Sequence, residues 1–389
     1  MKRTFVSRNI QNTGPVYLDC NATAPMEPAV RDAVIRWLSD EIGNAGSRTH
    51  EYGLRAKRAV QAAREQVATV VGVSAEEVLF TSGATESNNL AILGIGPHGE
   101  SEGRRHIVST VIEHKAVLEP LNSLATKGFA ITLVKPDAGG VVSADAIRAA
   151  LRPDTLLVSV MQVNNETGAR QPIEEIAAVL ADHDAYFHVD AAQGFGKELG
   201  GLRCPRIDLI SISSHKIYGP VGVGALVARR RGFKKPPLAP LFYGGGQERG
   251  LRPGTLPVPL VIGFGLAAEL ARMNAKEREA RCVAIRSEAL VALHSLEIRL
   301  HGDPQHTLPH VLNFSVEGID SEALIVALKD LAAVSNGSAC TSQSYEPSHV
   351  LAAMGLPQKA IAGAVRLSWC HMTPDVDWSA IARRIESLR

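Results

Sequence analysis

Between residues 55 and 228, short apolar runs alternate with helix-like stretches. The runs are rich in Val, Ile and Leu at successive positions, which is typical of strands in a sheet covered by helices on both faces. They lie at residues 78–81, 106–110, 131–135, 156–162, 185–189, 209–213 and 224–228. The helix-like stretches lie at residues 55–71, 116–125, 144–152 and 173–182. This alternation predicts an α/β fold with a mainly parallel, seven-stranded sheet.

After Gly254 the pattern changes and predicts a smaller α+β domain. A long helix-compatible stretch, an apolar run, a helix-like stretch and a final helix follow at residues 259–296, 310–316, 321–331 and 378–388. We assign residues 26–265 to a large domain, and residues 1–25 and 266–389 to a small one. Residues 337–349 of the small domain are rich in Ser, Gly and Thr and lack periodicity, which is typical of a mobile loop.

Composition and charge exclude several classes of function. The 41 Lys and Arg residues nearly balance the 40 Asp and Glu residues, so bulk charge favours neither nucleic-acid nor membrane binding. No apolar run approaches the roughly 18–20 residues that cross a bilayer, and residues 1–13 lack the apolar core of a secretory signal. Five widely spaced cysteines without a Cys-x-x-Cys pair argue against a disulfide framework and a structural metal site. These features predict a cytoplasmic protein with reduced thiols.

Two apolar runs end in ionisable side chains that suit an aldehyde cofactor. The run at 209–213 leads to Lys216, which is expected beyond the carboxyl end of a strand, where ligands bind in α/β sheets. A lysine amine forms a Schiff base with an aldehyde, and burial favours the free amine. Asp190 ends the run Phe-His-Val-Asp and is suited to pair with a protonated ring nitrogen. Each residue also has an ordinary alternative, a solvated loop lysine and a helix N-cap respectively.

Other runs are followed by further polar groups. The segment Phe80-Thr-Ser-Gly-Ala-Thr85 turns from a strand into a helix, whose free N–H groups form an anion cradle suited to a phosphate. It matches no nucleotide-binding loop, and a capped helix is the alternative interpretation. His114 can stack on a flat ring or transfer protons, and residues 164–168 offer amide and carboxylate groups. Because all these segments follow strands, we expect them to converge on one crevice.

With these residues assembled, the chain resembles pyridoxal-phosphate enzymes of fold type I, and more closely the cysteine desulfurase family. The resemblance covers nearly the whole chain. It rests on the blocks Tyr17-Leu-Asp-Cys-Asn-Ala-Thr-Ala-Pro25, Gly43-Asn-Ala-Gly-Ser-Arg-Thr-His50, Thr81-Ser-Gly-Ala-Thr-Glu-Ser87, Gly244-Gly-Gly-Gln-Glu-Arg-Gly-Leu-Arg-Pro-Gly-Thr-Leu-Pro257 and Val365-Arg-Leu-Ser-Trp369.

The resemblance implies pyridoxal 5'-phosphate as the cofactor and a role for each candidate residue. Lys216 would carry the cofactor as a Schiff base and later act as a base, and His114 would stack on the ring and assist proton transfer. The remaining cofactor contacts would be Asp190 to the ring nitrogen, Gln193 to the ring hydroxyl oxygen, and Ala84, Thr85, Ser213 and His215 to the phosphate. Thr255 would join the phosphate from a second subunit, which implies a homodimer. Asn165 and Arg366 would bind the substrate carboxylate, a task that suits a planar guanidinium.

The loop at about 335–350 determines the implied reaction. In the family the nucleophilic cysteine lies in Ser-Ala-Cys-Thr-Ser before Glu-Pro-Ser, which is where Cys340 lies here. The implied activity converts L-cysteine to L-alanine, while Cys340 accepts the sulfur as a persulfide and passes it to an acceptor protein. The other four cysteines, Cys20, Cys204, Cys282 and Cys370, are interpreted as structural. Cys370 and His371 stand where the family usually has glycine and arginine.

Alternative functions remain open at this point. An aminotransferase, a selenocysteine lyase or a kynureninase-like hydrolase on the same fold would not need Cys340. A sulfur-relay platform with little turnover would not need the cofactor groups. The acceptor can belong to iron–sulfur assembly, tRNA thiolation or DNA phosphorothioation. The chain ends at Arg389, without the tail by which many relatives contact the iron–sulfur scaffold, and its Leu-Asp-Cys-Asn opening loosely resembles desulfurases of DNA phosphorothioation.

Overall fold

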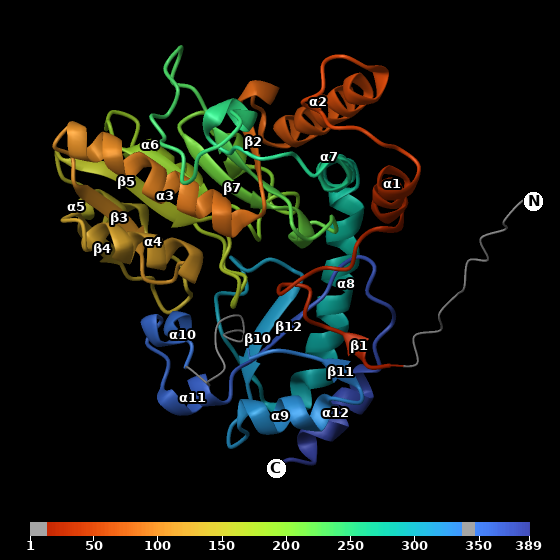
Figure 1. Ribbon diagram of the computed structural model, residues 1–389. Coiled ribbons are helices and arrows are strands. Elements are labelled where there is room, and N and C mark those ends of the chain that lie inside the picture. Colours follow the sequence, from red (N-terminus) through yellow and green to blue (C-terminus); the bar gives the residue numbers. More distant parts are fainter. Residues whose placement is uncertain (1–13, 337–346) are drawn as a thin grey trace, which may run out of the picture.

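The computed structural model describes residues 14–336 and 347–389. A large α/β layer structure occupies the upper part of Figure 1, and a smaller group of strands and helices lies below it. Helix α8 (Ala275–Leu293) runs from the first part into the second. The predicted division of the chain at residue 265 stays a prediction.

The central sheet has seven strands and is mainly parallel, as predicted. In spatial order the strands are β2 (Val78–Thr81), β8 (Gly224–Ala228), β7 (Leu209–Ser213), β6 (Tyr186–Asp190), β5 (Thr155–Met161), β3 (His106–Thr110) and β4 (Ala130–Val134). Only β8 runs antiparallel to its neighbours, β2 and β7. The carboxyl ends of β7, β6, β5 and β3 therefore meet at one edge, where their following loops can form a common site.

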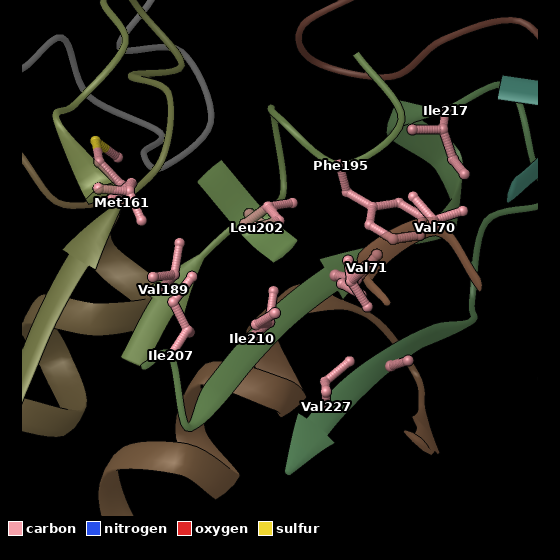
Figure 2. Packing of buried hydrophobic residues seen from close by; sticks show 14 of the residues in the cluster. Val70, Val71, Met161, Val189, Phe195, Leu202, Ile207, Ile210, Ile217 and Val227 are labelled. Carbon is pink, nitrogen blue, oxygen red and sulfur yellow. The ribbon is translucent and has the colours of Figure 1, made fainter. Parts of the chain in front are cut away.

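Helices cover both faces of this sheet, which explains why its strands are apolar on both sides. On one face Leu209 of β7 packs with Leu90 of α3 (Ala84–Ser101). On the other, Ile210 packs in a core to which Phe264 of α7 (Val258–Met273) also belongs. Figure 2 shows part of this core, where Val189, Ile210 and Val227 lie near one another. The remaining large-domain helices are α1 (Pro28–Ser39), α2 (Glu51–Val71), α4 (Lys115–Ala125), α5 (Ala144–Ala150), α6 (Ile173–Val179) and α7 (Val258–Met273).

The single long helix predicted at 259–296 is two helices. Helices α7 and α8 meet at Asn274, whose φ of −104° and ψ of 15° interrupt the helix, and the two axes differ by 75°. The bend lets α7 pack against α1 and α2 while α8 continues into the smaller part. No single helix among the described residues is long and apolar enough to cross a membrane. The bent pair of α7 and α8 together has the length and composition of a membrane span, and no other feature of the described residues indicates one.

The smaller part has its own core and two small sheets. Strands β12 (Val365–Ser368), β10 (Val311–Ser315) and β9 (Arg299–Leu300) form an antiparallel sheet, and β1 (Val16–Tyr17) pairs with β11 (Ala332–Ala333). The helices here are α9 (Ser321–Leu328), α10 (His349–Ala353), α11 (Gln358–Ala362) and α12 (Trp378–Glu386). Leu18 joins Trp369 and Trp378 in a buried cluster, so the start of the described chain packs against its end.

Candidate active site

A cavity of about 430 Å³ lies at the carboxyl ends of the central strands. Ten of the residues predicted from the sequence line it, namely Ala84, Thr85, His114, Asn165, Asp190, Gln193, Ser213, His215, Lys216 and Arg366. They come from segments that follow β2, β3, β5, β6 and β7, and from β12 of the smaller part. The expected convergence on one crevice is therefore present in the fold.

Lys216 ends a tight 3-10 turn, Ser214–Lys216, directly after β7. Its Nζ donates hydrogen bonds to the carbonyl oxygens of Asn21 and, at 2.7 Å, Ala22. The turn closes on Gly219, where an added Cβ would lie 2.1 Å from Oγ of Ser214. A residue without a side chain thus lets the chain after Lys216 pack closely against the turn that carries the lysine.

Asp190 is a nearly buried carboxylate at the end of β6. Its Oδ2 accepts a hydrogen bond from Nδ2 of Asn88 at 2.7 Å, and its Oδ1 accepts one from the backbone N–H of Ala192 at 2.9 Å. The contact with Ala192 lies within a turn and is similar to the helix N-cap that was the alternative interpretation of Asp190. Both donors are neutral, which leaves the negative charge able to pair with a cation in the cavity.

Gln193 and Asn21 meet at the same edge of the cavity. Nε2 of Gln193 donates to the carbonyl oxygen of Asn21 at 3.0 Å, and an amide nitrogen has a second hydrogen to donate. Oε1 of Gln193 and Oδ1 of Asn21 are buried without a hydrogen-bond partner among the described residues. A polar ligand in the cavity would satisfy such atoms.

The anion cradle expected after β2 is the N-terminus of α3. Gly224 lies so close that an added Cβ would meet Cα of Gly83 at 2.6 Å, which packs the β8 backbone directly under this turn. The first N–H groups of a helix have no partner within the helix and favour an anion. His215 and Ser213 line the same cavity, and burial lowers the pKa of His215 to about 4, so its imidazole is neutral near pH 7.

His114 caps helix α4. Its Nδ1 accepts a hydrogen bond from the backbone N–H of Ala116 at 3.0 Å, so in the neutral ring the proton resides on Nε2. Burial is the main cause that lowers its pKa; Lys216 lowers it further and Asp190 raises it. A flat, neutral imidazole thus lines the cavity near both charged groups.

Arg366 is the buried guanidinium of the site, with 1% of its side chain exposed. Nη1 donates to the backbone carbonyl of Asn165 at 2.9 Å, and Nη2 donates to Oδ1 of Asp19 at 2.6 Å. Nε has no hydrogen-bond partner among the described residues. The guanidinium is therefore fixed in place while one of its donors remains available to an anion.

One predicted site residue that the structure describes, Thr255, does not line this cavity. Thr255 lines a separate surface hollow of about 680 Å³, together with Ile42, Gly43, Asn44 and Tyr52. Cys340 lies outside the described residues, as does most of the loop that was predicted to be mobile. The flanks of that segment are placed beside the site, because Ser335 pairs with the backbone of Arg366 and Oγ of Ser348 donates to Oε2 of Glu166 at 2.5 Å.

Sequence reasoning missed Asn88 and the part played by Asn21. Asn88 lies inside α3 and meets Asp190 only through the fold, so no local pattern indicates it. Asn21 acts mainly through its carbonyl oxygen, a group that every residue has. Asn21 does lie in a block that carried the family resemblance, which was the one available signal.

The site thus places a lysine, a carboxylate and an anion-binding helix N-terminus at one edge of a seven-stranded α/β sheet. The chain belongs to the aminotransferase class-V family, whose model matches residues 16–378. A cysteine desulfurase IscS from Methylococcus capsulatus is 43% identical over 380 residues, which cover 96% of this chain and 93% of that protein. The solved structure of DndA from Streptomyces lividans is 50% identical with a TM-score of 0.80, over 91% of this chain and 99% of that one. SspA in complex with cysteine is 35% identical with a TM-score of 0.79, over 91% and 98%.

Proposed function

We propose that the chain is a pyridoxal-phosphate-dependent cysteine desulfurase that converts L-cysteine to L-alanine and transfers the sulfur to Cys340. The observation that carries this proposal is the meeting of Lys216, Asp190, the α3 N-terminus and Arg366 in one cavity. The similarity to proteins named cysteine desulfurase, at 43–44% identity over most of the chain, supports the same activity.

The cavity residues fit the cofactor. Lys216 would bind its aldehyde carbon, and Asp190 would pair with its ring nitrogen. The α3 N-terminus with Ser213 and His215 would hold its phosphate, and Oε1 of Gln193, which has no partner among the described residues, would find one. When bound, pyridoxal phosphate supplies an electron sink that stabilises negative charge at the substrate α-carbon.

Side chains of the protein would carry out the remaining steps. Arg366 and Asn165 would bind the substrate carboxylate, and Lys216 would take the proton from the α-carbon and return a proton to the product. The Cys340 thiolate would attack the substrate sulfur, so the carbon–sulfur bond breaks as a sulfur–sulfur bond forms. The balance is L-cysteine plus the Cys340 thiol giving L-alanine plus the Cys340 persulfide.

The described residues on either side of the segment that contains Cys340 support its proposed role. Asn336 is the last described residue before it, and Ser335 pairs with the backbone of Arg366 in the cavity wall. On the other side, Oγ of Ser348 donates to Oε2 of Glu166, which follows the cavity residue Asn165 in the chain.

The proposed quaternary state is a homodimer. Helices α1 and α2 and the turn between them present apolar side chains to solvent, with Leu38 and Ile42 exposed by 66% and 72%. Thr255 lies in the hollow lined by Ile42 and Tyr52. A partner on this surface would bury apolar area and could bring its own cavity against Thr255.

For the sulfur acceptor, we favour a protein of DNA phosphorothioation over iron–sulfur assembly or tRNA thiolation. The 50% identity to DndA is the observation that favours it. A persulfide-transfer assay with each candidate acceptor, using radiolabelled cysteine, tests this. Transfer to an iron–sulfur scaffold protein alone would contradict the preference while leaving the desulfurase activity intact.

The test of the activity is the release of sulfide and alanine from L-cysteine in the presence of a thiol reductant. We expect equal amounts of both products from the native chain and none from Lys216→Ala or Cys340→Ala. Cys204→Ala is the matched control, because Cys204 is not among the cavity residues. Full activity in Cys340→Ala would favour a selenocysteine lyase or an aminotransferase, and no cofactor absorbance would favour a sulfur-relay platform.

A further inference from the structure

Helix α10 lies against two loops that carry residues of the candidate active site. Its Val350 and Leu351 are 1% and 0% exposed and belong to the same buried core as Ile112 and Met161. Ile112 lies in the loop between β3 and His114, and Met161 ends β5 and lines the cavity. Apolar packing therefore holds α10 beside the active site, below α4 in Figure 1.

Ser348, the residue before α10, is 4% exposed and makes two hydrogen bonds. Its Oγ accepts the N–H of Leu351 at 3.0 Å, which caps the helix, and donates to Oε2 of Glu166 at 2.5 Å. Glu166 directly follows Asn165, and its backbone carbonyl accepts from Nδ2 of Asn313 at 3.1 Å. Ser348 thus holds the side chain of the residue next to Asn165, which is the proposed partner of the substrate carboxylate.

His349, the first residue of α10, contacts the other loop. Its Nε2 lies 3.0 Å from the backbone carbonyl oxygen of Glu113. A carbonyl oxygen only accepts, so Nε2 carries a proton and is the donor. That carbonyl belongs to the peptide group between Glu113 and His114, so the hydrogen bond fixes the orientation of the backbone from which the His114 side chain extends. The N–H of Met161 donates to Oε1 of Glu113 at 2.8 Å and holds the same residue from β5.

We propose that Ser348 and His349 are positioning residues with separate tasks in the proposed desulfurase reaction. Ser348 acts through Glu166 on Asn165, and so on the binding of the substrate carboxylate. His349 acts through His114 on the cofactor ring and on proton transfer. The inference rests on the proposed function, because the roles of Asn165 and His114 belong to it.

The two tasks predict different kinetic effects. The substrate carboxylate does not react, so a displaced Asn165 weakens the binding of substrate and transition state alike and raises the half-saturating concentration of cysteine. His114 is proposed to contact the reacting groups, so its displacement affects the transition state most and lowers the maximal rate. Each effect should be about tenfold, which is the loss expected for one hydrogen bond to a buried polar group.

Ser348→Ala and His349→Phe test these tasks in the cofactor-loaded chain. The rate of the first turnover of cysteine to alanine, measured by rapid quenching, gives a maximal rate and a half-saturating concentration. We expect Ser348→Ala to raise the half-saturating concentration about tenfold while the maximal rate stays within about twofold. We expect His349→Phe to lower the maximal rate about tenfold while the half-saturating concentration stays within about twofold.

Two further measurements do not need turnover. The Kd of L-alanine, read from the absorbance of the bound cofactor, should rise about tenfold in Ser348→Ala and stay within about twofold of native in His349→Phe. The visible circular dichroism of the bound cofactor should change in His349→Phe and not in Ser348→Ala, because only His114 is proposed to contact the ring.

Conservative variants and matched controls separate positioning from general stability. Ser348→Thr keeps the hydroxyl group and His349→Gln keeps an N–H donor, so each should restore its own measurements to within about twofold of native. Ser143→Ala removes a serine that caps α5 and does not line the cavity. His183→Phe removes a histidine whose Nε2 lies 3.1 Å from the backbone carbonyl oxygen of Arg152. Both control variants should behave as the native chain does.

The proposal is overturned if Ser348→Ala binds L-alanine as tightly as the native chain, or if both variants alter both kinds of measurement alike. If His349→Phe does not fold, His349→Leu removes the same donor with a smaller side chain. A native chain that binds the cofactor and L-alanine but makes no alanine from cysteine would contradict the proposed function instead. The L-alanine titration and the circular dichroism would then still test the two positioning tasks.

Discussion

Asp19 forms a partly buried ion pair with the cavity residue Arg366, with Oδ1 of Asp19 2.6 Å from Nη2 of Arg366. The guanidinium that is proposed to bind the substrate carboxylate is therefore already paired with a carboxylate of the protein. Asp19 has two opposite effects on substrate binding. It holds Arg366 in position through a hydrogen bond, and its negative charge repels a second carboxylate on the same guanidinium.

Substitutions of Asp19 separate the two effects. Asp19→Asn keeps an oxygen acceptor and removes the charge, so we expect KM for cysteine to fall about fivefold, equivalent to about 1 kcal/mol. Asp19→Ala removes the hydrogen bond as well, so KM should rise about tenfold. Steady-state kinetics of both variants is the measurement. A higher KM in Asp19→Asn would mean that the charge of Asp19 assists binding, contrary to this argument.

A buried ion pair of Arg64 and Glu248 stabilises the loop that leads to Thr255. The pair is bidentate at 2.6 and 2.7 Å, and Oε2 of Glu248 also accepts the N–H of Phe80 at 2.7 Å. Glu248→Ala would leave a buried guanidinium without its counter-charge, which costs about 3–5 kcal/mol. Urea denaturation measures the loss.

The control for Glu248 is an exposed pair in the same region. Arg230 and Glu76 lie 2.8 Å apart, with 33% and 69% of their side chains exposed. Glu76→Ala should cost less than about 1 kcal/mol, because water screens this pair. Equal losses in the two variants would show that burial of the Arg64 charge is not what makes Glu248 important.

The strand pattern predicted site residues that end apolar runs, and the family resemblance added Arg366 from β12, but neither indicated Asn88 or the part played by Asp19. Lys216 and Asp190 follow strands, so the strand pattern alone indicates where they lie. Asn88 contacts Asp190 from 102 positions away, and Asp19 meets Arg366 from 347 positions away. No local pattern contains such pairs.

The same limit applies to the fold. Alternation of strands and helices was sufficient to predict a seven-stranded, mainly parallel sheet, because each element buries a periodic apolar face. The 75° bend at Asn274 was missed, since the apolar pattern continues across it. The direction of α8 after that bend depends on how it packs in the smaller part of the fold, and the apolar pattern of the sequence does not indicate that packing.

Glu113 is a fully buried carboxyl group whose titration should affect stability. Burial raises its pKa to about 8, although Thr110 and the N–H of Met161 donate to its Oε1 at 2.8 Å. In the unfolded chain the group ionises near its ordinary value of 4.5. Stability from this group is therefore complete below about pH 4.5, falls as pH rises, and is lost by about pH 8.

Glu113→Gln mimics the protonated form and should remove this pH dependence. Its amide oxygen can still accept from Thr110 and Met161, and its amide nitrogen would occupy the place of Oε2, which has no partner among the described residues. Between about pH 5 and pH 8 we expect the thermal midpoint of the native chain to fall by several degrees more than that of Glu113→Gln. The exposed Glu100→Gln serves as the control and should follow the native chain.

Gly219 should be required for cofactor retention. An alanine Cβ would lie 2.1 Å from Oγ of Ser214, which must move, and 3.0 Å from the Ser214 carbonyl oxygen, which presses on the turn that carries Lys216. A displacement of about 1 Å at a catalytic group is enough to cost on the order of a hundredfold in rate. We expect purified Gly219→Ala to hold less than half as much pyridoxal phosphate per chain as the native protein, measured by absorbance after release in alkali.

Gly200→Ala is the matched control, because Gly200 has an ordinary φ of −57° and the nearest atom to an added Cβ would lie 3.6 Å away. Normal cofactor content in Gly219→Ala would show that the turn can open without moving Lys216.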